Sequence, residues 1–165
     1  MKITKNFFLI FFAFVFSILD TSFFSFLPII GEVTIISAYV AIIYFSISGQ
    51  INDFLIFTIA VIFFFSAFSS LPVWLVVLTF LLVPYFIFYI RKKYFPEPSI
   101  LSSLAFFGSG TFLFALTSII YSKEWNGKNI FTSFCFVLIN SAFGVLLYYV
   151  SKNIRKKLTR KDIKF

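Results

Sequence analysis

Few side chains in this 165-residue sequence are of types that carry out chemistry. The sequence contains no histidine, one cysteine and six acidic residues. Without histidine, neither a Ser-His-Asp site nor a histidine-ligated zinc site can be built. The acidic residues are scattered, no glycine-rich phosphate loop occurs, and the single Cys135 can form neither an internal disulfide nor a metal cluster. We therefore expect no catalytic residue, no metal site and no cofactor.

Three polar residues are instead candidates for a partner-binding or polar site. Asp20 falls in an apolar run, where an ionisable group costs at least ~2.5–3.5 kcal/mol on membrane insertion. We expect it to cap a short interfacial helix over 22–27, with ion or partner binding as the alternative. Glu32 is expected to be a solvated charge in the outer connection that follows. Asn140 should have a hydrogen-bond partner inside a helix bundle.

Small residues recur at helical spacing in two apolar segments near the C-terminal end. They are Gly108, Thr111, Ala115 and Ser118 in the first segment, and Ser133, Val137, Asn140 and Gly144 in the second. A face of small side chains lets two helices approach closely, so the pattern favours helix packing. A ligand cavity between the two faces is the alternative.

The composition requires that these residues be positioned by membrane helices. Hydrophobic residues make up 61% of the chain, charged residues only 12%, and the mean hydropathy is +1.02, which excludes a water-soluble monomer. Since a crossing helix needs ~17–25 apolar residues, we predict an all-α membrane bundle within residues 1–150. Its six transmembrane helices cover about 7–27, 33–48, 54–68, 73–89, 100–121 and 130–150. The second and third are short enough to be tilted or re-entrant instead.

The lysines and arginines that give the chain its net charge of +8 are distributed as the orientation of a membrane protein requires. Twelve of the fourteen lysines and arginines lie near the N-terminus, in 91–93 or after residue 150. Six crossings with the N-terminus inside place all twelve in the cytoplasm, as the positive-inside rule expects. We therefore predict cytoplasmic termini and no nucleic acid partner. Residues 151–165 are predicted to be a basic cytoplasmic tail attracted to anionic lipid, with a specific protein partner as the alternative.

Several short sequence motifs along the chain resemble those of a known family. The first predicted span closes on Leu-Asp-Thr-Ser-Phe at 19–23, followed by Phe-Leu-Pro at 26–28. The third runs into Ser-Ser-Leu-Pro at 69–72, and the fourth ends in Arg-Lys-Lys-Tyr-Phe at 91–95. In these motifs, its length and its six-span layout, the chain resembles the family of the bacterial rod shape-determining protein MreD. Such proteins often carry a Gly and an Asp near the end of the third span, where this sequence has Ser66.

The resemblance implies a non-enzymatic, multi-pass subunit of the cell-elongation machinery in the inner membrane. Its partners would be an MreC-like membrane-anchored protein, an actin-like filament protein and the peptidoglycan synthases. The alternative is a small transporter or the substrate-binding membrane subunit of a vitamin importer, with a polar-lined cavity near Asn140, Thr111 and Ser118. A third hypothesis is a lipid or polyprenyl-carrier translocase, with a lateral groove and basic contacts to the headgroup.

Overall fold

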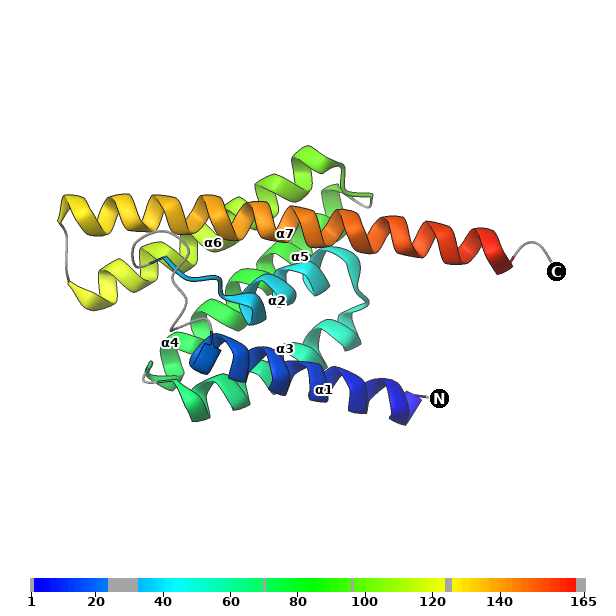
Figure 1. The fold of residues 1–165 in the computed structure, drawn as a ribbon, viewed down its shortest axis with the longest axis horizontal. Coiled ribbons are helices and arrows are strands. Elements are labelled where there is room, and N and C mark those ends of the chain that lie inside the picture. Colours follow the sequence, from blue (N-terminus) through cyan, green and yellow to red (C-terminus); the bar gives the residue numbers. More distant parts are fainter. Residues whose placement is uncertain (1, 24–32, 70, 96, 124–125, 163–165) are drawn as a thin grey trace.

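The computed structural model describes residues 2–23, 33–69, 71–95, 97–123 and 126–162, and all regular elements in these ranges are helices (Figure 1). Side chains are described except those of 2–3, 23 and 155–162. The elements are α1 (Lys2–Ile18), the π-helical turn η1 (Leu19–Phe23), α2 (Ser37–Ser48), α3 (Ile51–Phe68), α4 (Val73–Val77), the π-helical turn η2 (Leu78–Leu82), α5 (Val83–Tyr94), α6 (Ile100–Ser122) and α7 (Gly127–Asp162).

Five of the described helical stretches are long and apolar enough to cross a membrane. They are Thr4–Ser22, Ile51–Phe68, Val73–Tyr94, Ile100–Ser122 and Gly127–Ile154. The prediction of an all-α membrane bundle is therefore confirmed at this level. The predicted second span, 33–48, is not a full-length helix. Only its part in α2 is helical, and those 12 residues rise ~18 Å, well short of ~30 Å of hydrocarbon.

The short helix α2 lies at the centre of the bundle. Nine of its 12 residues are buried, and it packs against α7, α5, α3, α6 and α1. A helix that is apolar all round is stable only when surrounded, so its composition suits this place. The surrounding helices turn many large apolar side chains outwards, for example Phe7, Phe63 and Leu101. Such a surface suits contact with lipid.

The fourth predicted span contains an irregular turn. The π-helical turn η2 separates α4 from α5, and Pro84 is the second residue of α5. Proline lacks an N–H and clashes with the preceding turn, so it disturbs the helix N-terminal to it. The stretch nevertheless continues to Tyr94, which makes it long enough to cross.

The last helix is much longer than a membrane is thick. The 36 residues of α7 rise ~54 Å, against ~30 Å of hydrocarbon. The helix runs without interruption through residue 151, where we predicted the tail to begin, and continues to Asp162. Its C-terminal part projects beyond the bundle, at the same end as the N-terminus (Figure 1).

Candidate functional site: a polar clamp on a broken membrane segment

The residues just before α2 form a non-helical stretch of backbone inside the bundle. Residues 33–36 are not helical, and α2 begins only at Ser37. Even if fully extended at ~3.3 Å per residue, these four residues would add at most ~13 Å to the ~18 Å of α2. We call 33–48 the broken span. Non-helical backbone at membrane depth is tolerated only where protein groups satisfy its N–H and C=O groups.

Asp20 satisfies the first N–H groups of α2. Its Oδ1 accepts hydrogen bonds from the Ser37 N–H at 2.8 Å and the Ser37 hydroxyl at 2.6 Å, and its Oδ2 accepts one from the Ala38 N–H at 2.7 Å. The first N–H groups of a helix have no partner within it, and a carboxylate there also interacts favourably with the helix dipole. Asp20 therefore caps α2, whose first residue, Ser37, lies 17 residues further along the chain. The helix that we expected it to cap, over 22–27, lies largely outside the described residues.

Asn140 satisfies the backbone just before α2. Its Oδ1 accepts a hydrogen bond from the Ile36 N–H at 3.0 Å, and its Nδ2 donates to the Thr34 carbonyl at 3.2 Å and to the Phe136 carbonyl at 3.0 Å. The side chain is fully buried. Asn140 thus has the partners that a buried amide requires, two on the broken span and one on its own helix α7. We call Asp20 and Asn140 together the polar clamp, and Glu32, the third predicted polar residue, lies outside the described residues.

Tyr39 adds a contact near the same end of α2 that the sequence analysis did not identify. Its hydroxyl donates to the Gly110 carbonyl of α6 at 3.0 Å. Its ring is fully buried, with centroids 5.2 Å from Phe80 and 5.1 Å from Phe114. Ser37 was missed too, although serine is favoured where helices begin. These contacts fix α2 against α6.

The small residues predicted to pack helices lie along the α6–α7 contact, the most extensive between any two helices in the described chain. The Thr111 hydroxyl is 3.1 Å from the Ser141 hydroxyl across this contact. A Cβ on Gly144 would overlap the Phe107 ring, so a larger residue here would force that ring to shift. A Cβ on Gly108 would meet nothing closer than 3.9 Å.

Gly110, which the sequence analysis did not select, faces a different helix. A Cβ there would approach Ile43 of α2 to 2.6 Å and Ile87 of α5 to 3.3 Å. Two residues turn a helix by ~200°, so Gly110 and Gly108 lie on opposite sides of α6. Gly110 therefore packs directly against the side chains of Ile43 and Ile87.

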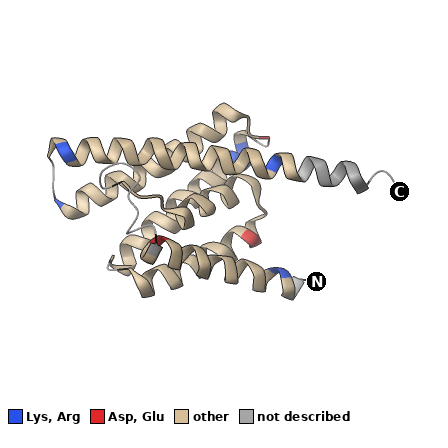
Figure 2. Cartoon of the chain, in the orientation of Figure 1, with Lys and Arg blue, Asp and Glu red and all other residues tan. Residues whose placement is uncertain are grey.

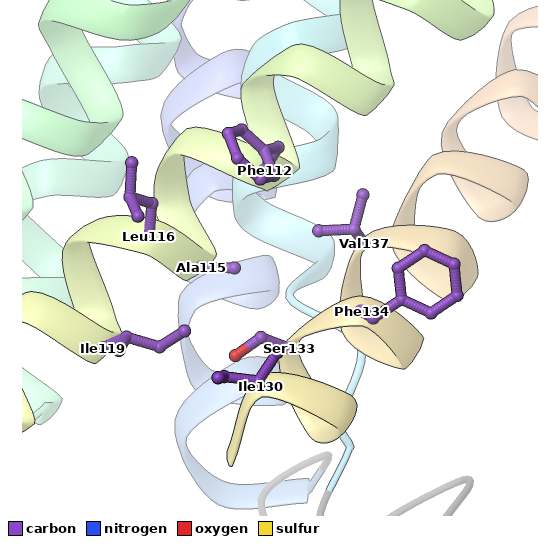
Figure 3. A pocket seen from close by; sticks show the side chains of 8 residues that line it. All are labelled: Phe112, Ala115, Leu116, Ile119, Ile130, Ser133, Phe134 and Val137. Atoms are coloured by element: carbon purple, nitrogen blue, oxygen red, sulfur yellow. The ribbon is translucent and has the colours of Figure 1, made fainter. Parts of the chain in front are cut away.

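Near the α6–α7 connection the two helices separate around a cavity of about 440 Å³ (Figure 3). Ala115 and Ser133 line it together with Phe112, Leu116, Ile119, Ile130, Phe134 and Val137. A smaller cavity of about 140 Å³ on the neighbouring side is lined by residues that include Ser118 and Thr34. Ser118 donates to the Phe114 carbonyl at 3.0 Å. Among the cavities described, none is lined by Asn140, Thr111 and Ser118 together, and the first two side chains are fully buried and hydrogen-bonded within the bundle.

Charged groups form few contacts in the described residues. Lys5 of α1 pairs with Asp53 in the first turn of α3 at 2.6 Å, where both side chains are partly exposed. No group of three His, Cys, Asp or Glu residues in this part of the chain is placed to hold a metal ion.

No protein-family model, curated protein or solved structure matches the chain. The function must therefore be argued from the polar clamp, the cavity and the distribution of charge.

Proposed function

We propose that the chain is a non-enzymatic subunit of the bacterial cell-elongation machinery in the inner membrane. It crosses the membrane six times, with the broken span as the second crossing, and both termini are cytoplasmic. It regulates cell shape and peptidoglycan synthesis by holding partner proteins. These are an MreC-like protein, an actin-like filament protein and the peptidoglycan synthases.

The observation that carries this proposal is that both residues of the polar clamp form hydrogen bonds with the backbone of the chain itself. Where transporters contain broken helices, the amino end of a half-helix often faces an anionic substrate. Here the carboxylate of Asp20 already occupies the amino end of α2, and the amide of Asn140 bonds to the backbone before it. The polar groups at membrane depth thus hold the shape of the bundle. This favours a scaffold over an importer subunit.

The arrangement of charge supports the orientation. Both termini lie at one end of the bundle (Figure 1), and Lys5, Arg91 and Lys152 lie towards that end of their helices. Lys123 and Lys128 flank the α6–α7 connection at the opposite end (Figure 2). The more basic end belongs in the cytoplasm by the positive-inside rule.

Partners would bind to the surfaces that the compact bundle leaves available. One is the lipid-facing aromatic side of α1, where Phe7, Phe8, Phe11 and Phe12 are at least half exposed. Another is the projecting end of α7, whose basic sequence also suits contact with an anionic leaflet.

The test is purification of the tagged chain from its native membranes in mild detergent, read by mass spectrometry. We expect recovery of an MreC-like protein or an elongation-phase peptidoglycan synthase, and rounded or widened rods after depletion. The double variant Lys156→Gln/Lys157→Gln should lose cytoplasmic partners, whereas Lys123→Asn/Lys128→Gln, with equal charge loss at the other end, should keep them. Recovery of ATPase and coupling subunits, or unchanged shape on depletion, would contradict the proposal and favour the importer.

A further inference from the structure

The cavity between α6 and α7 is open to an apolar occupant. Its lining is carbon apart from the hydroxyl of Ser133, which faces the space between the helices (Figure 3). Along α6 the lining runs from Phe112 to Ile119, a rise of ~10 Å. The volume of about 440 Å³ lies within the ~300–1,000 Å³ of small-molecule sites.

Aromatic residues place this cavity just below the membrane surface. Trp74, at the start of α4, and Tyr121, near the end of α6, are exposed, and their ring centroids are 6.3 Å apart. Exposed Trp and Tyr side chains gather at the headgroup level of membrane proteins. Tyr121 follows Ile119 by two residues, so the cavity begins on the hydrocarbon side of this level. That is the depth of a lipid acyl chain.

Positive charge lies directly beyond the aromatic level. Lys123 directly follows α6 with a φ of 58°, one turn after Ile119, and Lys128 precedes Ile130 by two residues. Both lysines are exposed. Glu124 lies outside the described residues, and the segment 123–128 carries a net charge of +1. Two basic residues therefore follow the lining residues of α6 and precede those of α7, on the side of the cavity where a lipid phosphate would lie.

We propose that the cavity binds one acyl chain of an anionic phospholipid, with the phosphate held by Lys123 and Lys128. The lipid belongs to the leaflet opposite the two termini. It is a bound lipid that fills the space between α6 and α7. The site requires only that the chain is embedded in a membrane. Lipid binding here is therefore independent of the proposed role in cell elongation, and each proposal can fail without the other.

The experiment reconstitutes the full chain in vesicles of equal parts phosphatidylcholine and phosphatidylglycerol, extracts it in detergent and counts retained lipids by native mass spectrometry. Ser133→Phe fills the cavity, and Val137→Phe fills it from another position. Leu138→Phe is the matched control, because Leu138 is 55% exposed on α7 and is not part of the lining. The charge test compares Lys123→Asn/Lys128→Gln with Lys92→Gln/Lys152→Gln at the other end. Asparagine is chosen because it tolerates the left-handed conformation of residue 123.

We expect the wild-type chain to retain phosphatidylglycerol in preference to phosphatidylcholine. A filling variant should lower this retention about tenfold while Leu138→Phe preserves it. Loss of Lys123 and Lys128 should reduce the preference about fivefold or more, since a basic residue near a membrane surface contributes ~1 kcal/mol. Equal retention in the filling and control variants would overturn the proposal, as would equal retention of the two lipids. A lipid-free dimer that only the filling variants disrupt would assign the cavity to a second copy of the chain.

Discussion

Replacing Asp20 by asparagine tests whether the polar clamp holds the broken span. Asparagine keeps the size of the side chain and one of its two acceptor oxygens. The remaining oxygen can still accept from the Ser37 N–H and hydroxyl, which now bond to Oδ1. An NH₂ group replaces the oxygen that accepts from the Ala38 N–H at 2.7 Å, so two donors then face each other. The variant therefore breaks one defined contact.

The size of the effect follows from the burial of that contact. Ala38 is fully buried and Asp20 is 9% exposed, so water does not replace the lost acceptor. A buried donor left without a partner costs ~1–3 kcal/mol. We expect Asp20→Asn to lower stability by about 2 kcal/mol, which corresponds to a fall in Tm of roughly 4–8 °C at ~2–4 °C per kcal/mol. Asp20→Ala, which removes all three hydrogen bonds, should cost more, about 2–6 kcal/mol for two unpaired N–H groups.

The single cysteine supplies the assay. Cys135 is partly buried in α7, so a thiol-reactive fluorogenic dye reports unfolding of the detergent-solubilised chain during heating. The matched control is Asp53→Asn, the same substitution in a partly exposed ion pair with Lys5. Such pairs contribute ~0–1 kcal/mol, so this Tm should change by less than about 4 °C.

The comparison between the two aspartates decides the outcome. A larger loss of Tm for Asp20→Asn than for Asp53→Asn supports the clamp. Equal shifts, or an unchanged or raised Tm for Asp20→Asn, would refute the assignment of Asp20 as the cap of α2. The cost of its charge at membrane depth would then outweigh its hydrogen bonds.

Three further predictions concern the rest of the bundle. Asn140→Ala should lower Tm by an amount comparable to the Asp20 variants, and the double variant should depart from additivity by about 0.5 kcal/mol or more, because both side chains hold one stretch of backbone. Gly144→Ala should cost ~1–3 kcal/mol through overpacking against an aromatic ring. Gly108→Ala should be neutral or stabilising by up to ~1 kcal/mol. Equal changes in Tm for Gly144→Ala and Gly108→Ala would contradict the close contact of Gly144 with Phe107. In a chain carrying Cys135→Ser, single cysteines at the exposed positions Gln50 and Gly127 should react with an impermeant reagent from opposite sides of the membrane, and same-side labelling would contradict six crossings.

The long helices were largely predictable from composition. The expected span 54–68 corresponds to α3, Ile51–Phe68, and 100–121 corresponds to α6, Ile100–Ser122. In both, a continuous apolar run is bounded by polar or helix-breaking residues, and a membrane helix satisfies its own backbone hydrogen bonds. Local sequence therefore contains most of the information that determines such an element.

The broken span could not be predicted in the same way. Residues 33–48 form an apolar run like the others, and the groups that permit its non-helical start come from positions 17 and 104 residues away. Asp20 was expected to be a cap, but the chain alone does not reveal which helix it caps. Gly110 was missed because the small-residue pattern of α6 was followed only on the side that faces α7.

The separation of 104 residues between Ile36 and Asn140 has a consequence for biosynthesis. At a synthesis rate of ~5–20 residues per second, the ribosome makes Asn140 roughly 5–20 s after Ile36. During that interval the Ile36 N–H and the Thr34 carbonyl lack their native partner, and hydrocarbon offers no substitute. Until α7 is made, these two groups need water or other protein groups as partners. The native hydrogen bonds of Thr34 and Ile36 are therefore complete only after the last helix of the chain has been synthesised.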